Sequence, residues 1–364
     1  MNIERIPVGY ADKERKELFN MPFRKYTCLL VVAQPRYGKG AVAKPLSVKL
    51  SHKRPMCFFD FKGEWRTHVT RLNYKSQHPD CITRYKIYTN FTFKLSAFTF
   101  TEDWVSMGYQ GPNAVDICNL FNDSKAYHHG VPDRFMELLK SLPTNNKEFE
   151  QYTPQAYNVD LNTSLHPETK RSWIRIFERG KRWFWQGTED QRPVYDFGKE
   201  WLQQQNIFID FSFTETMDTD TVHRNRTFFG KIMQELRPYY TRIQGIIVIE
   251  EADTLVPNVG NEYKPSSNQQ LINFTAKAPK EGMGLIVLLQ SPKQTDNSIF
   301  TGGQWSYLLG MYADYPKRFP KLYYDPEHNI REFLFVDVNQ RWKKIIPLEP
   351  CCEYESNIKG GMIV

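Results

Sequence analysis

Residues 246–253 read Ile-Ile-Val-Ile-Glu-Glu-Ala-Asp, a run of aliphatic residues that ends in two adjacent carboxylates. A run that is apolar on both faces predicts a buried strand of a parallel sheet. Two neighbouring buried acids are costly unless a cation or hydrogen bonds compensate them. The pattern is that of a Walker B site, in which Glu250 would hold magnesium and Glu251 would polarise the water that attacks a γ-phosphate. The alternative is a strand that leads into a charged turn.

Further apolar runs, rich in β-branched and aromatic residues, are separated by long helical or irregular stretches, and they predict more buried strands. These runs are Thr27–Ala33, Met56–Phe61, Asn206–Phe211 and Gly284–Leu289. Their alternation with helices indicates a doubly wound α/β core. Near the C-terminus, Glu332–Val338 and Arg341–Pro347 flank Asn339-Gln340, and we expect a terminal β-hairpin there.

The first of these runs leads into a Gly-Lys turn and then into a predicted helix. A Walker A loop reads G-x-x-x-x-G-K-[S/T] between a strand and a helix, and its backbone N–H groups and lysine surround the phosphates. Gly38-Lys39 matches that pattern, whereas Ala33 replaces the first glycine and Gly40 replaces the magnesium-binding hydroxyl. The other interpretation is a structural Gly-Lys turn. The residues predicted to bind nucleotide are Gln34, Pro35, Arg36, Tyr37, Gly38, Lys39, Gly40 and Ala41.

Polar residues also end two of the other predicted strands. Gln290 ends the run Gly284–Leu289, and an amide beside a Walker B strand can sense the γ-phosphate or orient the attacking water. Asp60-Phe61-Lys62-Gly63-Glu64 ends the run at Met56–Phe61. Open α/β sheets place ligands at the carboxyl ends of their strands, although a polar turn would have the same composition.

The interval from about 100 to 200 lacks the signature of buried strands, and helical stretches are expected at Pro132–Ser141 and Pro167–Trp185. We expect three parts: 1–99 as the first part of the α/β core, 100–200 as a mainly helical insertion subdomain, and 201–364 as the second part of the core. The segment Pro257–Asn268 is rich in Pro, Gly, Ser and Asn, and it predicts a mobile loop.

The composition, 40% hydrophobic, 24% charged and 15% aromatic, is that of a globular protein. No apolar run approaches the roughly 18–20 residues of a membrane span. The charged N-terminus does not resemble a signal peptide. The six cysteines form no C-x-x-C pair and fit a reducing compartment. We therefore expect a soluble, cytoplasmic protein. The net charge of +7 permits a polyanionic partner without requiring one.

Taken together and in order, these segments resemble the FtsK–HerA superfamily of DNA-pumping P-loop ATPases. The family's D-P-K-G-E strand end is similar to Asp60–Glu64, and its I-D-L-S strand to Ile209–Ser212. Its D/E-E-A-H Walker B matches Glu250–Asp253, the proline that follows matches Pro257, and its T-Q-R-P strand end is similar to Leu289–Pro292. The hairpin also looks like the family's C-terminal strands. The resemblance covers most of the chain except the insertion, and it implies that 1–99 and 201–364 together form a RecA-like P-loop core.

The resemblance implies an ATPase that hydrolyses ATP with Mg²⁺ at the subunit interfaces of a homo-oligomeric ring, a hexamer by preference, and moves double-stranded DNA. The compact size looks most like viral genome-packaging ATPases, which implies virion association and a capsid or membrane-associated portal partner. A plasmid or conjugation-type coupling ATPase fits nearly as well. Catalytic roles are carried over to Lys39, Glu251 and Gln290.

Two departures from the family weaken the expected hydrolysis. Gly40 removes the Walker A hydroxyl unless Ser47 or a neighbour compensates. The family's trans-acting arginine has no counterpart before the fifth strand, where Lys277 or Lys280 is the candidate, with Lys280 preferred. Lysine lacks the planar fork of arginine. A nucleotide-binding scaffold with weak or no hydrolysis and a P-loop enzyme acting on a small substrate remain as alternatives.

Two segments are candidates for contact with DNA. Residues 167–185 place Arg171, Arg175, Arg179 and Arg182 at helical spacing. This stripe fits a phosphate track, but it fits better a solvated arginine face over a packed aromatic one. The loop Asn258–Asn268, with Lys264, is the better candidate by position, because DNA in ring motors meets loops that face the pore.

Overall fold

The structure of the chain is a computed structural model that describes residues 4–12, 14–23, 28–61, 63, 65, 85–89, 92–124, 132–151, 164–185, 196–204, 206–211, 219–259, 263–301, 304–325 and 330–348. Within these residues the strands form an 11-stranded sheet in the order β2-β1-β13-β12-β9-β3-β8-β7-β4-β6-β5, and β10 (Tyr324–Asp325) pairs separately with β11 (Ile330–Arg331). None of the described helices has the length and apolar content that a membrane crossing requires.

The strands from β9 to β5 are parallel and form the core of the sheet. They are β9 (Trp305–Leu309), β3 (Cys28–Val32), β8 (Gly284–Leu289), β7 (Ile246–Ile249), β4 (Met56–Asp60), β6 (Asn206–Asp210) and β5 (Lys86–Tyr88). All five predicted apolar runs are therefore strands, to within a residue or two at each end. Strand β9, which lies beside β3, was not predicted.

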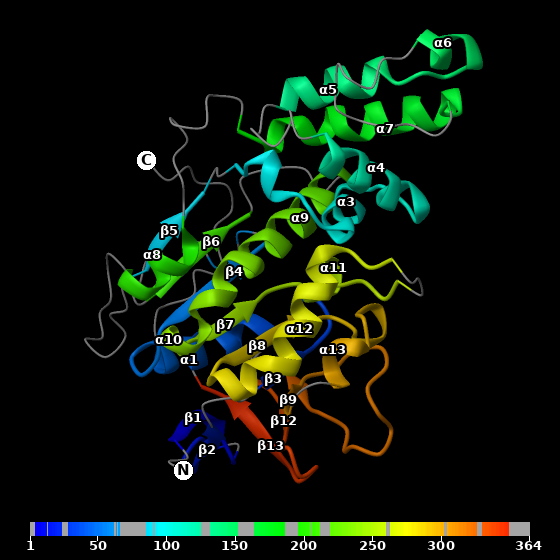
Figure 1. Ribbon diagram of the computed structural model, residues 1–364. Helices are drawn as coiled ribbons and strands as arrows, with labels where there is room; N and C mark the ends of the chain where they lie inside the picture. The colour runs from blue at the N-terminus through cyan, green and yellow to red at the C-terminus, as the bar shows by residue number, and fades with distance from the viewer. Residues whose placement is uncertain are drawn as a thin grey trace, which may run out of the picture.

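Antiparallel strands extend the sheet beyond β9. They are β12 (Phe333–Val336), β13 (Trp342–Pro347), β1 (Glu4–Tyr10) and β2 (Leu18–Phe23). The predicted C-terminal hairpin is confirmed as β12 and β13, paired from Phe333 with Ile345 to Val336 with Trp342. In Figure 1 these strands lie at the end of the molecule opposite the helices of residues 132–180.

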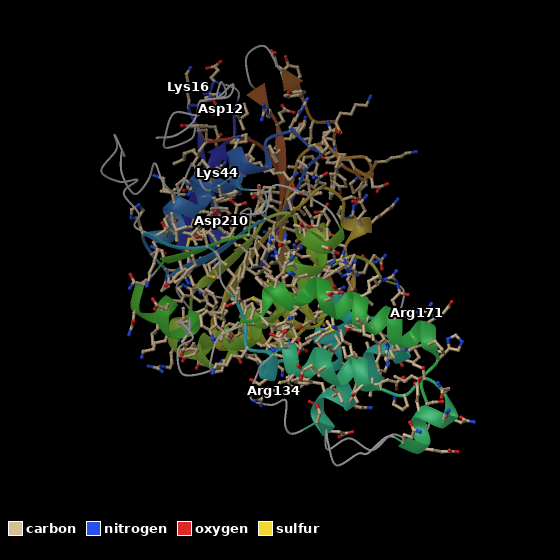
Figure 2. The ribbon with its side chains drawn as sticks, turned by 90° about the horizontal axis from the view of Figure 1, so that it is seen from above. Asp12, Lys16, Lys44, Arg134, Arg171 and Asp210 are labelled. Atoms are coloured by element: carbon tan, nitrogen blue, oxygen red, sulfur yellow. The ribbon has the colours of Figure 1, made fainter. Side chains whose placement is uncertain are left out.

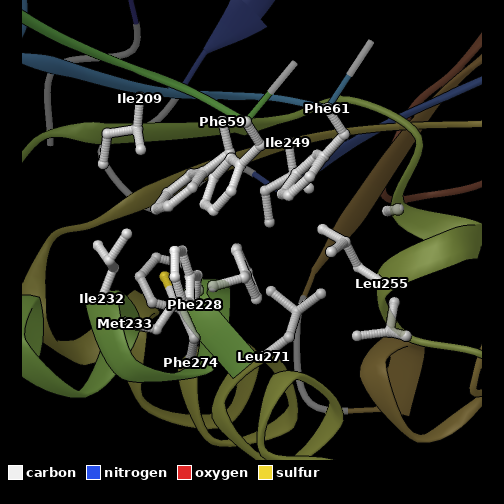
Figure 3. Close-up of a cluster of buried hydrophobic side chains, with 14 of the residues drawn as sticks. Phe59, Phe61, Ile209, Phe228, Ile232, Met233, Ile249, Leu255, Leu271 and Phe274 are labelled. Carbon is white, nitrogen blue, oxygen red and sulfur yellow. The ribbon is translucent and has the colours of Figure 1, made fainter. Parts of the chain in front are cut away.

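Helices cover both faces of the sheet, as the two-sided apolar strands require. Helix α1 (Lys39–Ser51) covers one face, and α9 (Thr219–Leu236), α11 (Ala252–Leu255) and α12 (Ser266–Glu281) cover the other. Figure 3 shows Phe59 and Ile249 from the strands packed against Phe228 and Met233 of α9 and Leu271 of α12. The remaining short helices outside the insertion are α8 (Phe197–Gln204), α10 (Tyr240–Ile243) and α13 (Ser298–Thr301).

The helices from residue 101 to residue 180 form an aromatic-rich layer that continues the core of the α9 face. They are α3 (Thr101–Met107), α4 (Pro112–Asp123), α5 (Pro132–Ser141), α6 (Asn146–Gln151) and α7 (Pro167–Gly180). The ring of Trp104 lies 5.4 Å from Phe121 and 5.6 Å from Phe135. The predicted helices at 132–141 and 167–185 are confirmed as α5 and as α7 with a 3-10 turn at Lys181–Trp183. The division of the chain at 100 and 200 stays a prediction.

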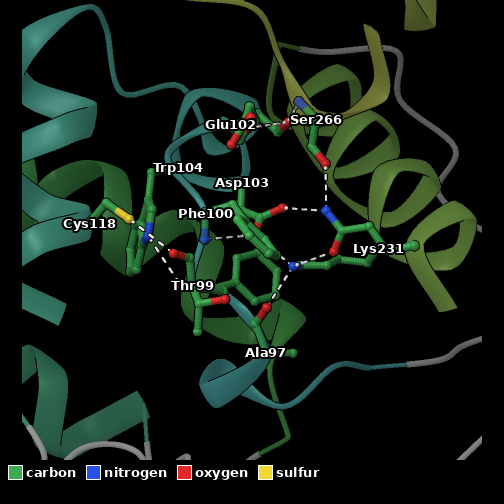
Figure 4. A network of polar contacts seen from close by, with 12 residues as sticks. Ala97, Thr99, Phe100, Glu102, Asp103, Trp104, Cys118, Lys231 and Ser266 are labelled. Atoms are coloured by element: carbon green, nitrogen blue, oxygen red, sulfur yellow. Dashed lines mark hydrogen bonds and ion pairs between the residues drawn. The ribbon is translucent and has the colours of Figure 1, made fainter. Parts of the chain in front are cut away.

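A buried ion pair ties this helical layer to the core (Figure 4). The Nζ of Lys231 in α9 lies 2.6 Å from Oδ2 of Asp103 in α3, and both side chains are almost completely buried. Lys231 also donates to the carbonyl of Ala97 and to Gln234. The amide of Gln234 in turn donates to Oγ of Ser266, at the start of α12. Three helices are thus joined through polar contacts in a region that is otherwise apolar.

Candidate functional site

The predicted Walker A segment lies between β3 and α1 and bends through two left-handed residues. Arg36 has φ 64° and Gly38 has φ 97°, and α1 begins at Lys39. The N–H of Tyr37 donates to the carbonyl of Gln34, which closes the turn. The Nζ of Lys39 donates to the carbonyl of Ala33 at 3.0 Å, so the lysine folds back over the loop. A helix N-terminus preceded by such a loop favours a bound anion.

Tyr37 is the loop residue whose side chain serves the fold rather than the predicted pocket. It is buried, its ring lies 5.5 Å from that of Phe333, and its hydroxyl donates to the carbonyl of Glu332 at 3.0 Å. Burial raises its pKa to about 12. Any contact of Tyr37 with a phosphate would therefore use its backbone. Gln34, Pro35 and Arg36 are exposed.

The predicted Walker B carboxylates follow β7 directly. The side chains of Glu250 and Glu251 are buried, at 4% and 5% exposure. The N–H of Glu250 donates to the carbonyl of Phe59, which holds the chain against β4. Glu251 adopts φ 50°, a left-handed conformation that costs a residue with a side chain about 1–3 kcal/mol.

Strand β8 lies between the P-loop strand β3 and the Walker B strand β7, so Gln290 emerges between the two predicted motifs. Its side-chain amide donates to Oε1 and Oε2 of Glu251 at 3.2 and 2.9 Å. Its backbone N–H donates to Oδ2 of Asp253 at 3.3 Å. The structure therefore brings Gln290 and Glu251 into direct contact, while their catalytic roles stay a prediction.

Asp253 is a further member of this cluster, and no role for it was predicted from the sequence. Burial and the charge of Glu251 raise its pKa, whereas the N–H of Gln290 and the charge of Lys39 lower it. Lys39 begins α1 directly after the P-loop, and β3 and β7 flank β8, so the P-loop lysine lies at the same edge of the sheet as the Walker B carboxylates. The sequence signal that could have identified Asp253 is its position two residues after Glu251, which puts both carboxylates on one short turn.

Other predicted residues lie at the same edge of the sheet with different functions. Asp60 accepts from the N–H groups of Gly63 and Trp65 at 2.9 and 3.0 Å, and so it stabilises the turn after β4. Asp210 is buried and opposite Asp60 in the register of β4 and β6. The predicted family positions Lys62, Glu64 and Ser212 lie outside the described residues.

Ser47 is not placed to supply the hydroxyl that Gly40 lacks. It lies eight residues beyond Lys39 in α1, and at about 1.5 Å per residue this is a rise of about 12 Å. Its Oγ is buried within the helix layer. The structure thus argues against the compensation that we considered from the sequence.

The lysines proposed to act in trans lie away from the P-loop of their own chain. Lys277 and Lys280 are exposed near the end of α12, which leads to the amino end of β8. The P-loop and Gln290 lie at the carboxyl edge of the sheet, about 17 Å away by the rise of a strand such as β8. Both lysines are therefore too far from the P-loop of their own chain to contact a phosphate there, and action in a neighbouring subunit stays a prediction.

The segment predicted as a mobile loop, Pro257–Asn268, is wrong at its end, because Ser266, Ser267 and Asn268 form the first turn of α12 and are fully buried. Serine and asparagine are common at helix starts as well as in loops, which explains the error. Lys264 forms an ion pair with Asp296 at 2.7 Å. That contact weakens its candidacy as a DNA ligand.

The arginines of α7 form a solvated face, as we favoured from the sequence. Arg171, Arg175, Arg179 and Arg182 are exposed, whereas Trp173 and Phe177 are buried. Arg179 pairs with Asp220 at 2.8 Å. Figure 2 shows Arg171 of α7 and Arg134 of α5 away from Asp210, the last residue of β6.

The carboxylates at this edge suit Mg²⁺. The ion prefers oxygen ligands and is usually bound through one or two carboxylates together with substrate phosphates and water. Among the described residues, no three His, Cys, Asp or Glu side chains are placed to hold a metal ion together. A magnesium ion held by Glu250 would therefore depend on nucleotide oxygens for much of its coordination.

No protein-family model matches the sequence, and no curated protein matches it. Among solved structures, VirB4 of Thermoanaerobacter pseudethanolicus is similar with a TM-score of 0.62 and 14% identity, over 96% of this chain and 98% of that chain. The plasmid coupling protein TrwB, in complex with ADP and Mg²⁺, gives a TM-score of 0.53 and 12% identity, over 98% and 97% of the two chains.

A third similar structure is the genome packaging NTPase B204 from Sulfolobus turreted icosahedral virus 2, at 11% identity over 89% of this chain and 99% of that chain. Its TM-score of 0.39 is too low to support an argument. VirB4 and TrwB match nearly the whole length of this chain, and this chain has their fold. The predicted fold, a P-loop core with a mainly parallel sheet, is therefore confirmed.

Proposed function

We propose that this chain is an ATP-driven motor that translocates double-stranded DNA. The observation that carries the proposal is the convergence of Lys39, Glu251 and Gln290 at the carboxyl edge of a sheet with the fold of VirB4 and TrwB. These three residues have the chemistry that phosphoryl transfer to water needs: a phosphate-binding cation, a base and a polar group that positions it.

In the proposed site the loop Gln34–Ala41 binds the phosphates through its N–H groups and Lys39. Glu251 accepts the proton of the attacking water, and Gln290 holds the Glu251 carboxylate in place by the hydrogen bonds described above. Bound through Glu250, Mg²⁺ would neutralise charge on the phosphates. Burial of both glutamates limits competition from bulk water for these contacts.

Assembly into a ring, by preference a hexamer, is part of the proposal. Charge that develops on the γ-phosphate calls for an additional cation, and Lys280 of a neighbouring subunit is the candidate. TrwB is a bacterial conjugative coupling protein, and its likeness to this chain supports DNA transfer beside genome packaging as the setting. If genome packaging is the setting, the proposal also includes a capsid or portal partner and association with a virion.

The alternative is a scaffold that binds nucleotide with little or no hydrolysis, and Gly40 is the residue that favours it. A test that separates the two compares the ATPase rate of the parent with that of Lys39→Ala, each with and without double-stranded DNA, while ultracentrifugation gives the particle mass. We expect DNA-stimulated hydrolysis by an oligomer, and none by Lys39→Ala. Tight ATP binding without hydrolysis at any DNA or protein concentration would support the scaffold.

A further inference from the structure

An arginine from the C-terminal part of the chain lies directly on the P-loop. Arg331 ends β11, and its Nη1 occupies the space that a Cβ on Gly38 would need. The same Cβ would lie 3.2 Å from Cδ of Arg331. Glycine at position 38 is required by its φ of 97°, and the absence of a Cβ also leaves the space in which the arginine packs. No role for Arg331 was predicted from the sequence.

An aromatic side chain supports the guanidinium of Arg331. Its Cζ lies 5.6 Å from the ring centre of Tyr324, a cation–π distance, and that ring lies 5.4 Å from the ring of Tyr37. Tyr37 is anchored to the loop backbone and to Phe333, so the P-loop and the arginine share one support. This packing holds the guanidinium at the loop and restricts its freedom to leave.

Within the described residues, Arg331 makes no ion pair with a carboxylate, and its buried Nε makes no hydrogen bond. Arg331 lies on Gly38, next to Lys39 and the positive end of α1. None of the contacts described for Arg331 supplies a negative charge. Such a group of positive charges is compensated best by an anion with several oxygens, and a guanidinium can bind two of them at once.

We propose that Arg331 binds an outer phosphate of the nucleotide held by the P-loop of its own subunit. This inference rests on the proposed function, because it assumes that the loop binds ATP. The Gly-Lys end of a P-loop faces the outer phosphates, so an arginine seated on Gly38 contacts the β- or γ-phosphate and not the α-phosphate alone. It adds a cis cation to Lys39, independently of the cation expected from the neighbouring subunit.

The test measures the affinity for ATP and for AMP by calorimetry, in a Glu251→Gln background that prevents hydrolysis. Arg331→Ala should weaken ATP binding about 10- to 100-fold, as expected for loss of a hydrogen bond to a charged group, and should change AMP binding much less. Arg331→Lys should recover part of the loss. Arg341→Ala, an exposed arginine in the turn between β12 and β13, is the matched control and should bind ATP like the parent.

Unchanged ATP affinity in Arg331→Ala, in a protein whose Lys39→Ala variant loses ATP binding, would overturn the inference and leave the proposed function intact. An equal loss of ATP and AMP affinity would also overturn it, because the arginine would then not distinguish the outer phosphates. If the protein with Arg331 intact binds no ATP, that result would instead contradict the proposed function. If Arg331→Ala does not fold, Arg331→Lys decides by the same comparison of ATP with AMP.

Discussion

The side-chain amide of Gln290, which follows β8, donates to both carboxylate oxygens of Glu251, which follows the neighbouring strand β7, at 3.2 and 2.9 Å. This contact holds the proposed base in one orientation in the absence of nucleotide. Gln290 is therefore a positioning residue for Glu251.

Replacement of Gln290 by Ala should lower kcat roughly 100-fold and leave KM nearly unchanged, because a base misplaced by about 1 Å loses that much. Steady-state ATPase kinetics measure both constants. Gln294→Ala, an exposed glutamine a few residues further along, is the control and should behave like the parent. Equal kcat values for the two variants would remove Gln290 from the site.

The two adjacent glutamates should have separable roles. Glu251→Gln should bind ATP and lose hydrolysis by about 10²- to 10⁴-fold, because an amide does not accept the proton of the attacking water. Glu250→Gln should instead raise the Mg²⁺ concentration needed for half-maximal activity. Titration of Mg²⁺ in both variants checks the assignment. A shift of the Mg²⁺ requirement in Glu251→Gln alone would reverse the roles.

Asp253 gives a prediction for the dependence of stability on pH. Its pKa is raised by burial and by the charge of Glu251, so the folded state holds this proton more tightly than the unfolded state. The parent therefore loses stability from this group as pH rises above the ordinary aspartate pKa of 3.8 and through the raised value. Asp253→Asn should have a higher Tm than the parent at pH 7 and a similar Tm at pH 4. A lower Tm at pH 7 would contradict this.

The sheet could be predicted from the sequence where strands are buried on both faces, because such strands are continuous apolar runs. Strands β3, β4, β6, β7 and β8 are of this kind. Strand β9, Trp-Ser-Tyr-Leu-Leu, carries a polar residue and a tyrosine, and only its pairing with β3 identifies it. The N-terminal strands β1 and β2 were missed because they pair mainly with each other and with the end of the chain.

The candidate site was partly predictable for a related reason. Lys39, Glu251 and Gln290 each end or follow a strand in the pattern of a motif, so their meeting at one edge follows from the parallel sheet. The contact of Arg331 with Gly38 depends on how β10 and β11 fold over the P-loop, and no local pattern reports it. The role of Asp60 in the turn after β4 could likewise be identified only from the structure.

The ion pair of Asp103 and Lys231 predicts a large effect on stability. Asp103→Ala would leave the buried ammonium of Lys231 without its carboxylate, and such a change costs about 3–5 kcal/mol. Urea unfolding measures the loss. The double variant Asp103→Leu/Lys231→Met should recover much of it, since no buried charge remains. A double variant as unstable as the sum of the singles would show that the pair is not coupled.

The trans role of Lys280 predicts complementation between inactive subunits. Lys280→Ala and Glu251→Gln subunits should each hydrolyse ATP slowly, and a mixture should regain activity because some interfaces combine an intact Glu251 site with an intact Lys280. An arginine finger contributes about 10³–10⁵ in rate, and a lysine should supply only part of that. Lys277→Ala is the matched comparison. A mixture no faster than the average of its components would exclude Lys280 from trans action.

Movement along double-stranded DNA tests the central claim most directly. A labelled third strand bound to a DNA duplex is released when a motor passes through it, and gel electrophoresis measures the released fraction over time. We predict release that requires ATP and is lost in both Lys39→Ala and Glu251→Gln. Hydrolysis of ATP by the oligomeric parent with no ATP-dependent release, on duplexes of any length or end structure, would contradict the assignment as a DNA-translocating motor.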